Sequence, residues 1–200
     1  MATSRSTPRV RLLAALMAVA VALVAVSERP SLHGMPGDVA QWAGFACVAM
    51  AALWRIWASV FIAGYKDATL VTAGPYAACR HPLYAGSLLA ALGIGLTTRS
   101  VALACALPVI SAILHARAIE AEESLLLATH GRAFEQYRND VPGFWPDFRR
   151  HAVPDTLLVQ PVILRKSFLD AGSILGAWLL VCVADRLQAA GMTPTLLRLP

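Results

Sequence analysis

The residues best suited to chemistry lie in one short segment, from Gly74 to Gly86, inside an otherwise apolar chain. Two prolines, Pro75 and Pro82, fix φ and remove backbone donors, so this segment should be a loop that ends one helix and begins another. First-turn N–H groups of the second helix lack intrahelical partners and favour an anionic ligand group. A membrane-interface turn with headgroup anchors is an equally good interpretation of the segment on its own. Its polar and aromatic side chains are Tyr76, Arg80, His81 and Tyr84.

A second polar cluster follows on a segment of strong helix formers, residues 115–130, which Gly131 is placed to cap. It contains the adjacent acids Glu122 and Glu123. Carboxylates bind hydroxyls or an ammonium group, whereas an arginine and a helix N-terminus bind a carboxylate. The two clusters together suit a small polar cofactor with charged ends. A solvated helix face is the competing explanation of the two acids.

The composition indicates an integral membrane protein. Charged residues make up 14% of the 200-residue chain and hydrophobic residues 58%, whereas a soluble domain has about 25% charged residues. The net charge of +5 comes from basic residues scattered at segment ends, so no nucleic-acid partner is expected. The four cysteines form no CxxC pair and no metal-like spacing with histidine, so no metal is expected either.

The apolar segments predict an all-α, polytopic membrane bundle of about five transmembrane helices in one domain, residues 1–200. The first span, residues 12–26, is short, and a cleavable signal peptide is the alternative. The second contains Arg55, which either snorkels to the interface or faces a polar cavity within the protein. Small residues in the third, Gly86, Gly93 and Gly95, should let helices approach closely. The second to fifth spans are predicted at residues 39–65, 83–97, 101–114 (continuing as a helix to 130) and 171–184.

The distribution of basic residues predicts the orientation. The N-terminus, the 66–82 loop and the 117–166 region hold most of the arginines, so all three should lie on the cytoplasmic side. Both polar clusters then share one side of the membrane, which favours a single cytoplasmic site in an inner or cytoplasmic membrane. The aromatic, proline-bearing segment 134–146 should either lie along the interface or fold back as a lid.

These two motifs resemble those of the isoprenylcysteine carboxyl methyltransferase family, a group that also includes phospholipid N-methyltransferases. The resemblance covers residues 55–146, which leaves 147–200 as a C-terminal extension with the last span. It departs from the family pattern at His130, at Phe134 and at Arg117, which is about one position from the usual arginine. The matching residues are 70–86 in the first motif and Glu122, Glu123, Leu126, Gly131, Tyr137, Val141, Pro142 and Pro146 in the second.

The resemblance implies a membrane methyltransferase that uses S-adenosylmethionine and admits a lipophilic or lipidated acceptor from the surrounding lipid. Arg55 and Arg117 are the expected ligands of a substrate carboxylate near the sulfonium. A lipophilic carboxylate is the expected acceptor. A lipid amine is the alternative, and a non-enzymatic membrane protein is the third hypothesis. By position, the cofactor pocket would be formed by Tyr76, Arg80, His81, Pro82, Tyr84, Gly86, Glu122, Glu123 and Tyr137.

Overall fold

The computed structural model describes residues 27–28, 32, 34–62, 69–150, 154, 156–157, 159–192 and 197–198. These residues are mainly helical, and the first predicted span, residues 12–26, lies outside them. Two strands of two residues each, β1 (Ser27–Glu28) and β2 (Leu197–Arg198), pair in parallel. The helices are α2 (Met35–Ile62), α3 (Pro75–Ala78), α4 (Pro82–Thr97), α5 (Val101–His130), α6 (Arg132–Asp140), the 3-10 helix η1 (Phe148–Arg150) and α7 (Pro161–Ala189).

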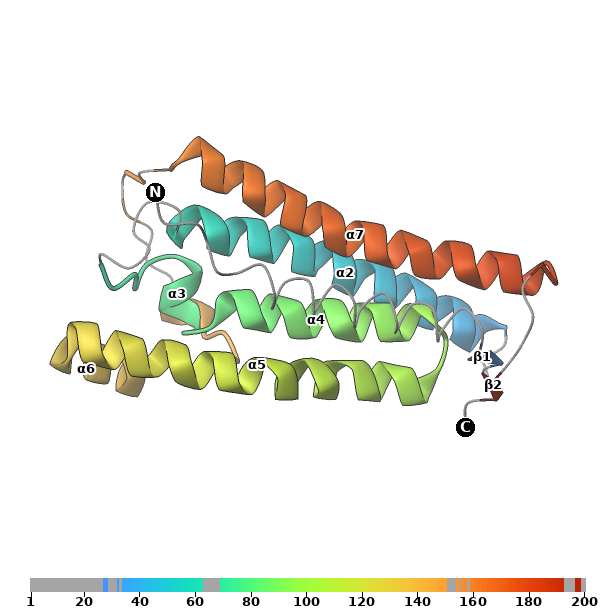
Figure 1. The fold of residues 1–200 in the computed structure, drawn as a ribbon, viewed down its shortest axis with the longest axis horizontal. Coiled ribbons are helices and arrows are strands. Elements are labelled where there is room, and N and C mark those ends of the chain that lie inside the picture. Colours follow the sequence, from blue (N-terminus) through green and yellow to red (C-terminus); the bar gives the residue numbers. More distant parts are fainter. Residues whose placement is uncertain are drawn as a thin grey trace.

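Four long helices lie side by side in the order α7, α2, α4 and α5 (Figure 1). Helix α2 packs against both α4 and α7, while α5 packs mainly against α4. Among the described residues, α2, α5 and α7 are long and apolar enough to cross a membrane. Helix α4 has 16 residues, or about 24 Å at 1.5 Å per residue. The predicted all-α membrane bundle is therefore confirmed, whereas the count of five spans stays a prediction.

The helix ends follow the local sequence. Pro82 occupies the first turn of α4, and the side chain of Ser100 caps α5 by accepting a hydrogen bond from the backbone N of Leu103. Gly131, with φ of 53°, ends α5 and its N–H donates to the carbonyl of Leu127, as predicted. Helix α7 begins at Pro161, well before the predicted apolar segment 171–184. Hydropathy identifies only the apolar part of a helix that would contact lipid. The more polar turns at the start of α7 were therefore not predicted.

Small residues bring α2 and α4 into close contact. A Cβ added at Gly93 would lie 2.7 Å from the carbonyl oxygen of Gly44, and one added at Gly44 would lie 2.6 Å from that of Gly93. A Cβ added at Gly95 would lie 2.6 Å from Cα of Ala104 in α5. Close backbone approach is a main source of helix association in lipid, and these contacts confirm the role predicted for Gly93 and Gly95.

Replacing Gly93 with valine should separate α2 from α4, because the backbone oxygen that meets the new side chain cannot move aside. We expect a loss of about 3 kcal/mol or more in unfolding free energy, measured by thermal unfolding in detergent. Gly176→Val is the matched control, since a Cβ at Gly176 of α7 meets nothing within 4 Å. A Gly93→Val protein as stable as the control would contradict the close packing of α2 on α4.

Candidate functional site

The two predicted polar clusters meet at Glu123. Its Oε1 accepts a hydrogen bond from Nε2 of His81 at 2.8 Å and one from Nε of Arg80 at 3.2 Å. The side chain of His81 is 4% exposed and that of Glu123 is 22% exposed, so these bonds are largely shielded from solvent. Hydrogen bonds to an ionised carboxylate are about twice as strong as neutral ones. Glu123 therefore joins the loop before α4 to the C-terminal half of α5.

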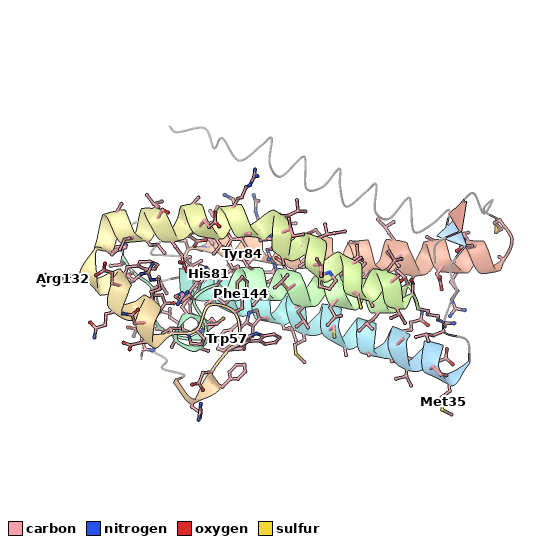
Figure 2. The ribbon with its side chains drawn as sticks, turned by 90° about the horizontal axis from the view of Figure 1, so that it is seen from below. Met35, Trp57, His81, Tyr84, Arg132 and Phe144 are labelled. Carbon is pink, nitrogen blue, oxygen red and sulfur yellow. The ribbon has the colours of Figure 1, made fainter. Side chains whose placement is uncertain are left out.

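The chain after α6 folds back onto the same loop. Of the two arrangements predicted for the 134–146 segment, the structure shows the folded-back one. The ring of Phe144 faces that of His81 with 5.9 Å between centroids, and both lie with Tyr84 at the end of the bundle remote from Met35 (Figure 2). Three backbone hydrogen bonds hold the segment, from Arg80 N to Pro142 O (2.8 Å), His81 N to Gly143 O (3.1 Å) and Asp147 N to Ala78 O (2.9 Å).

The side chain of Arg80 donates most of its hydrogen bonds to other residues of the protein. Its Nη1 donates to the carbonyl oxygens of Arg138 at 2.6 Å and Val141 at 2.8 Å, in addition to the Nε bond to Glu123. The guanidinium thereby connects the loop to the end of α6. Arg80 thus shapes the wall of the site and has few donors left for a ligand.

Tyr76 and Tyr137 form a buried pair beneath the loop. The hydroxyl of Tyr137 donates to the backbone oxygen of Tyr76 at 2.7 Å. The hydroxyl of Tyr76 is buried and has no hydrogen-bond partner among the described residues. Burial, followed by the charge of Glu122, raises the pKa of Tyr76, so this hydroxyl keeps its proton. A buried polar group without a partner costs about 1–3 kcal/mol, and this one fits a site that a polar ligand completes.

Glu122 faces the tyrosines rather than the loop backbone. It interacts electrostatically with the hydroxyl groups of Tyr76, Tyr84 and Tyr137. The ring of Tyr84 lies between two histidine rings, with centroid distances of 5.9 Å to His81 and 5.1 Å to His115. The two adjacent acids therefore have different partners, because Glu123 binds the loop and Glu122 lies beside the tyrosine hydroxyls.

Arg55, predicted to hold a substrate carboxylate, is bonded to neighbouring helices. Its Nη1 donates to the carbonyl oxygen of Leu83 at 2.8 Å and to Oγ of Ser87 at 2.6 Å, and its Nε donates to Oδ2 of Asp170 at 2.9 Å. Its Nη2 also pairs with Asp170. Every nitrogen of this guanidinium is engaged, so Arg55 connects α2 to α4 and α7. Of the two placements predicted for it, the inward-facing one is closer to the structure.

Pro82 and Gly86 contribute through the contact between α4 and α2. The carbonyl of Pro82 accepts a hydrogen bond from Nε1 of Trp54 at 2.7 Å. A Cβ added at Gly86 would lie 2.7 Å from Cγ of Arg55, so glycine is required for this helix contact. Arg117 is exposed on α5 and has no ion pair among the residues that the structure describes. The structure therefore does not bring Arg117 into the cluster around Glu123.

The sequence reasoning missed two participants, His115 and Asp170. His115 precedes Glu122 by seven residues, about two helical turns, so a helix places them on the same face. That spacing was the available signal for His115. Asp170 stands at the edge of an apolar segment, where an acid needs a partner, but its spacing does not identify Arg55 as that partner.

Parts of this chain are similar in sequence to known proteins. The model of the isoprenylcysteine carboxyl methyltransferase family matches residues 40–128. The nickel-cobalt-cadmium resistance protein NccN of Alcaligenes xylosoxydans xylosoxydans is 32% identical over 157 residues, which cover 78% of this chain and 73% of that protein. The cobalt-zinc-cadmium resistance protein CzcN of Cupriavidus metallidurans is 32% identical over 149 residues, covering 74% and 68%.

The protein-S-isoprenylcysteine O-methyltransferase of Schizosaccharomyces pombe is 35% identical over 81 residues, which cover 40% of this chain and 34% of that protein. No solved structure matches the chain significantly. The segment shared with the family model includes the loop of Arg80 and His81 and the helix of Glu122 and Glu123. With its two motifs joined at Glu123, the chain belongs to the isoprenylcysteine carboxyl methyltransferase family.

Proposed function

We propose that this protein is an integral membrane methyltransferase that uses S-adenosylmethionine to methylate a lipophilic carboxylate. The observation that carries the proposal is the joining of the two family motifs by Glu123, which binds both His81 and Arg80. The site also offers chemistry that fits the cofactor. The Glu122 carboxylate suits hydroxyl or ammonium groups, and the unpartnered hydroxyl of Tyr76 supplies a buried hydrogen-bonding atom.

When bound, S-adenosylmethionine supplies an electrophilic methyl group on a sulfonium. The residues proposed to hold it are Tyr76, His81, Tyr84, Glu122 and Glu123. Tyr137 would position Tyr76 through its hydrogen bond to the Tyr76 backbone oxygen. An acceptor carboxylate is ionised at neutral pH, so the protein needs no general base to activate it. Transfer would join a carboxylate oxygen to the methyl group and leave the sulfur as a thioether. The protein's contribution is to align the two groups and to exclude water.

We place the site at the cytoplasmic face of the membrane. The bundle end that carries it also carries Arg80 and helix α6, which holds Arg132 and Arg138. Basic residues accumulate on the cytoplasmic side of membrane proteins. A lipophilic acceptor would approach from the lipid along α5, in which Ala104 is the one buried residue.

Calorimetry with S-adenosylmethionine on detergent-purified protein tests the cofactor assignment. We expect saturable binding in the micromolar range and transfer of a labelled methyl group to an S-farnesylated N-acetylcysteine. Label released by mild base indicates a methyl ester, whereas base-stable label on a lipid amine would favour N-methylation instead. Absence of cofactor binding at high micromolar concentration would overturn the enzymatic proposal and favour a non-enzymatic membrane protein.

The names of the two resistance proteins describe those relatives. Within the described part of this chain, no group of three His, Cys, Asp or Glu side chains is arranged to hold a metal ion. The residues that carry the proposed function are those in contact around Glu123, Tyr76 and Tyr84.

A further inference from the structure

His115 lies where the apolar and polar halves of α5 meet. The helix is almost entirely apolar from residue 101 to 114, and its first acid, Glu120, follows five residues after His115. The His115 ring packs edge-on against Tyr84, with centroids 5.1 Å apart and planes at 71°. Tyr84 in turn interacts with Glu122. His115 thus contacts Tyr84, one of the residues proposed to hold the cofactor, from the apolar half of the helix.

The orientation of the His115 ring is fixed by the backbone of its own helix. Nδ1 lies 2.6 Å from the carbonyl oxygen of Ser111, and a carbonyl only accepts hydrogen bonds, so Nδ1 carries a proton and donates it. Oγ of Ser111 is 3.5 Å from the same nitrogen. One ring nitrogen, Nε2, is therefore left to act on another molecule, and the ring has a defined direction.

A carboxylate acceptor needs a donor at this boundary. The arginines of the site are bonded largely within the protein, and Nη2 of Arg80 is their one nitrogen without a hydrogen-bond partner among the described residues. Arg55 is bonded to Asp170, Leu83 and Ser87. Arg80 is bonded to Glu123 and to backbone carbonyls. His115 is the group on α5 that faces Tyr84 and can present a donor, since a protonated imidazole has an N–H at both nitrogens.

We propose that His115 is a specificity-determining residue whose doubly protonated ring donates Nδ1–H to Ser111 and binds the acceptor carboxylate through Nε2–H. One carboxylate oxygen accepts this hydrogen bond, which leaves the other oxygen to form the bond to the methyl group. No proton is transferred, and the products are a methyl ester and a thioether. The inference rests on the proposed function and adds to it the residue that recognises the acceptor.

The test measures acceptor and cofactor separately in His115→Phe, which keeps an aromatic ring against Tyr84. With S-farnesylated N-acetylcysteine as acceptor, we expect kcat/KM to fall about 10- to 100-fold, the range for loss of one charge-assisted hydrogen bond. Calorimetric affinity for S-adenosylmethionine should stay within about threefold of the wild-type value, since His115 is not among the residues proposed to bind the cofactor. His130→Phe, at the end of the same helix, is the matched control and should leave both quantities unchanged.

Two further variants separate recognition from a structural role. The amide nitrogen of glutamine can occupy the position of Nε2, and His115→Gln should recover part of the lost kcat/KM. Asparagine can replace only Nδ1, and His115→Asn should behave like His115→Phe. Rescue by asparagine instead of glutamine would show that the bond to Ser111 is what matters and would overturn the inference.

The remaining outcomes also decide the question. Wild-type turnover by His115→Phe, or an equal loss of cofactor affinity, would overturn the role in acceptor recognition. A wild-type protein that binds the cofactor but does not methylate this carboxylate would overturn the inference and leave the cofactor assignment standing. A wild-type protein that binds no cofactor would overturn both proposals.

Discussion

Replacing Glu123 with glutamine should weaken binding of S-adenosylmethionine about 10- to 100-fold while leaving the helical bundle folded. The carboxylate accepts hydrogen bonds from His81 and Arg80, and a glutamine amide can present N–H groups to these donors instead. Hydrogen bonds to charged groups contribute about 1.5–3 kcal/mol each. Their loss would release the loop from α5 and misplace the proposed cofactor wall. Calorimetry gives the affinity, and thermal unfolding in detergent reports the fold.

Glu120→Gln is the control for this change, because Glu120 is exposed on the same helix one turn earlier. It should bind the cofactor as the wild type does. Suppose instead that Glu123→Gln aggregates while its folded fraction keeps full cofactor affinity. Glu123 would then be a structural residue and not part of the cofactor site.

Replacing Asp170 with leucine should lower the free energy of unfolding by about 2–3 kcal/mol. The change leaves Arg55, whose side chain is 17% exposed, without the carboxylate that neutralises it. Breaking a fully buried pair costs about 3–5 kcal/mol, and the expectation here is smaller because the Asp170 side chain is 45% exposed. Thermal unfolding of the detergent-purified protein measures the loss.

The double variant Arg55→Met with Asp170→Leu should recover most of that stability. Removing both charges leaves no unpaired ion, and an apolar replacement of a buried pair is often neutral or stabilising. The two single variants and the double variant form a cycle that isolates the pair interaction. A double variant as unstable as Asp170→Leu would show that the cost lies elsewhere, for example in lost bonds from Arg55 to Leu83 and Ser87.

The sequence predicted the parts of the fold that depend on local chemistry. Proline fixes the start of α4 at Pro82, glycine ends α5 at Gly131, and the glycines of α4 permit close packing. Adjacent residues such as Glu122 and Glu123 point in directions about 100° apart on a helix, so spacing alone did not say which one meets His81. The helix order around them decides that question, and it depends on packing between distant segments.

The role of Arg55 shows the same limit. A charge inside an apolar segment requires a partner, and the sequence was sufficient to mark Arg55 as unusual. Its partner Asp170 is 115 residues away on α7, and the two side chains meet because α7 packs beside α2. The expected substrate ligand is therefore a connector between helices. The first predicted span lies outside the described residues and stays a prediction.

Helix α4 is short, and its length bears on whether the reaction rate would depend on the concentration of the acceptor in the bilayer or in water. Its 16 residues extend about 24 Å, less than a hydrocarbon core of about 30 Å. If the turn at Thr98 lies at one surface, a helix of this length would stop short of the other, while α2 and α5 extend past the start of α4 (Figure 1). The proposed acceptor would then reach the site by lateral diffusion without leaving the bilayer. Its mole fraction among the lipids, and not its amount per volume of water, would set the rate of encounter.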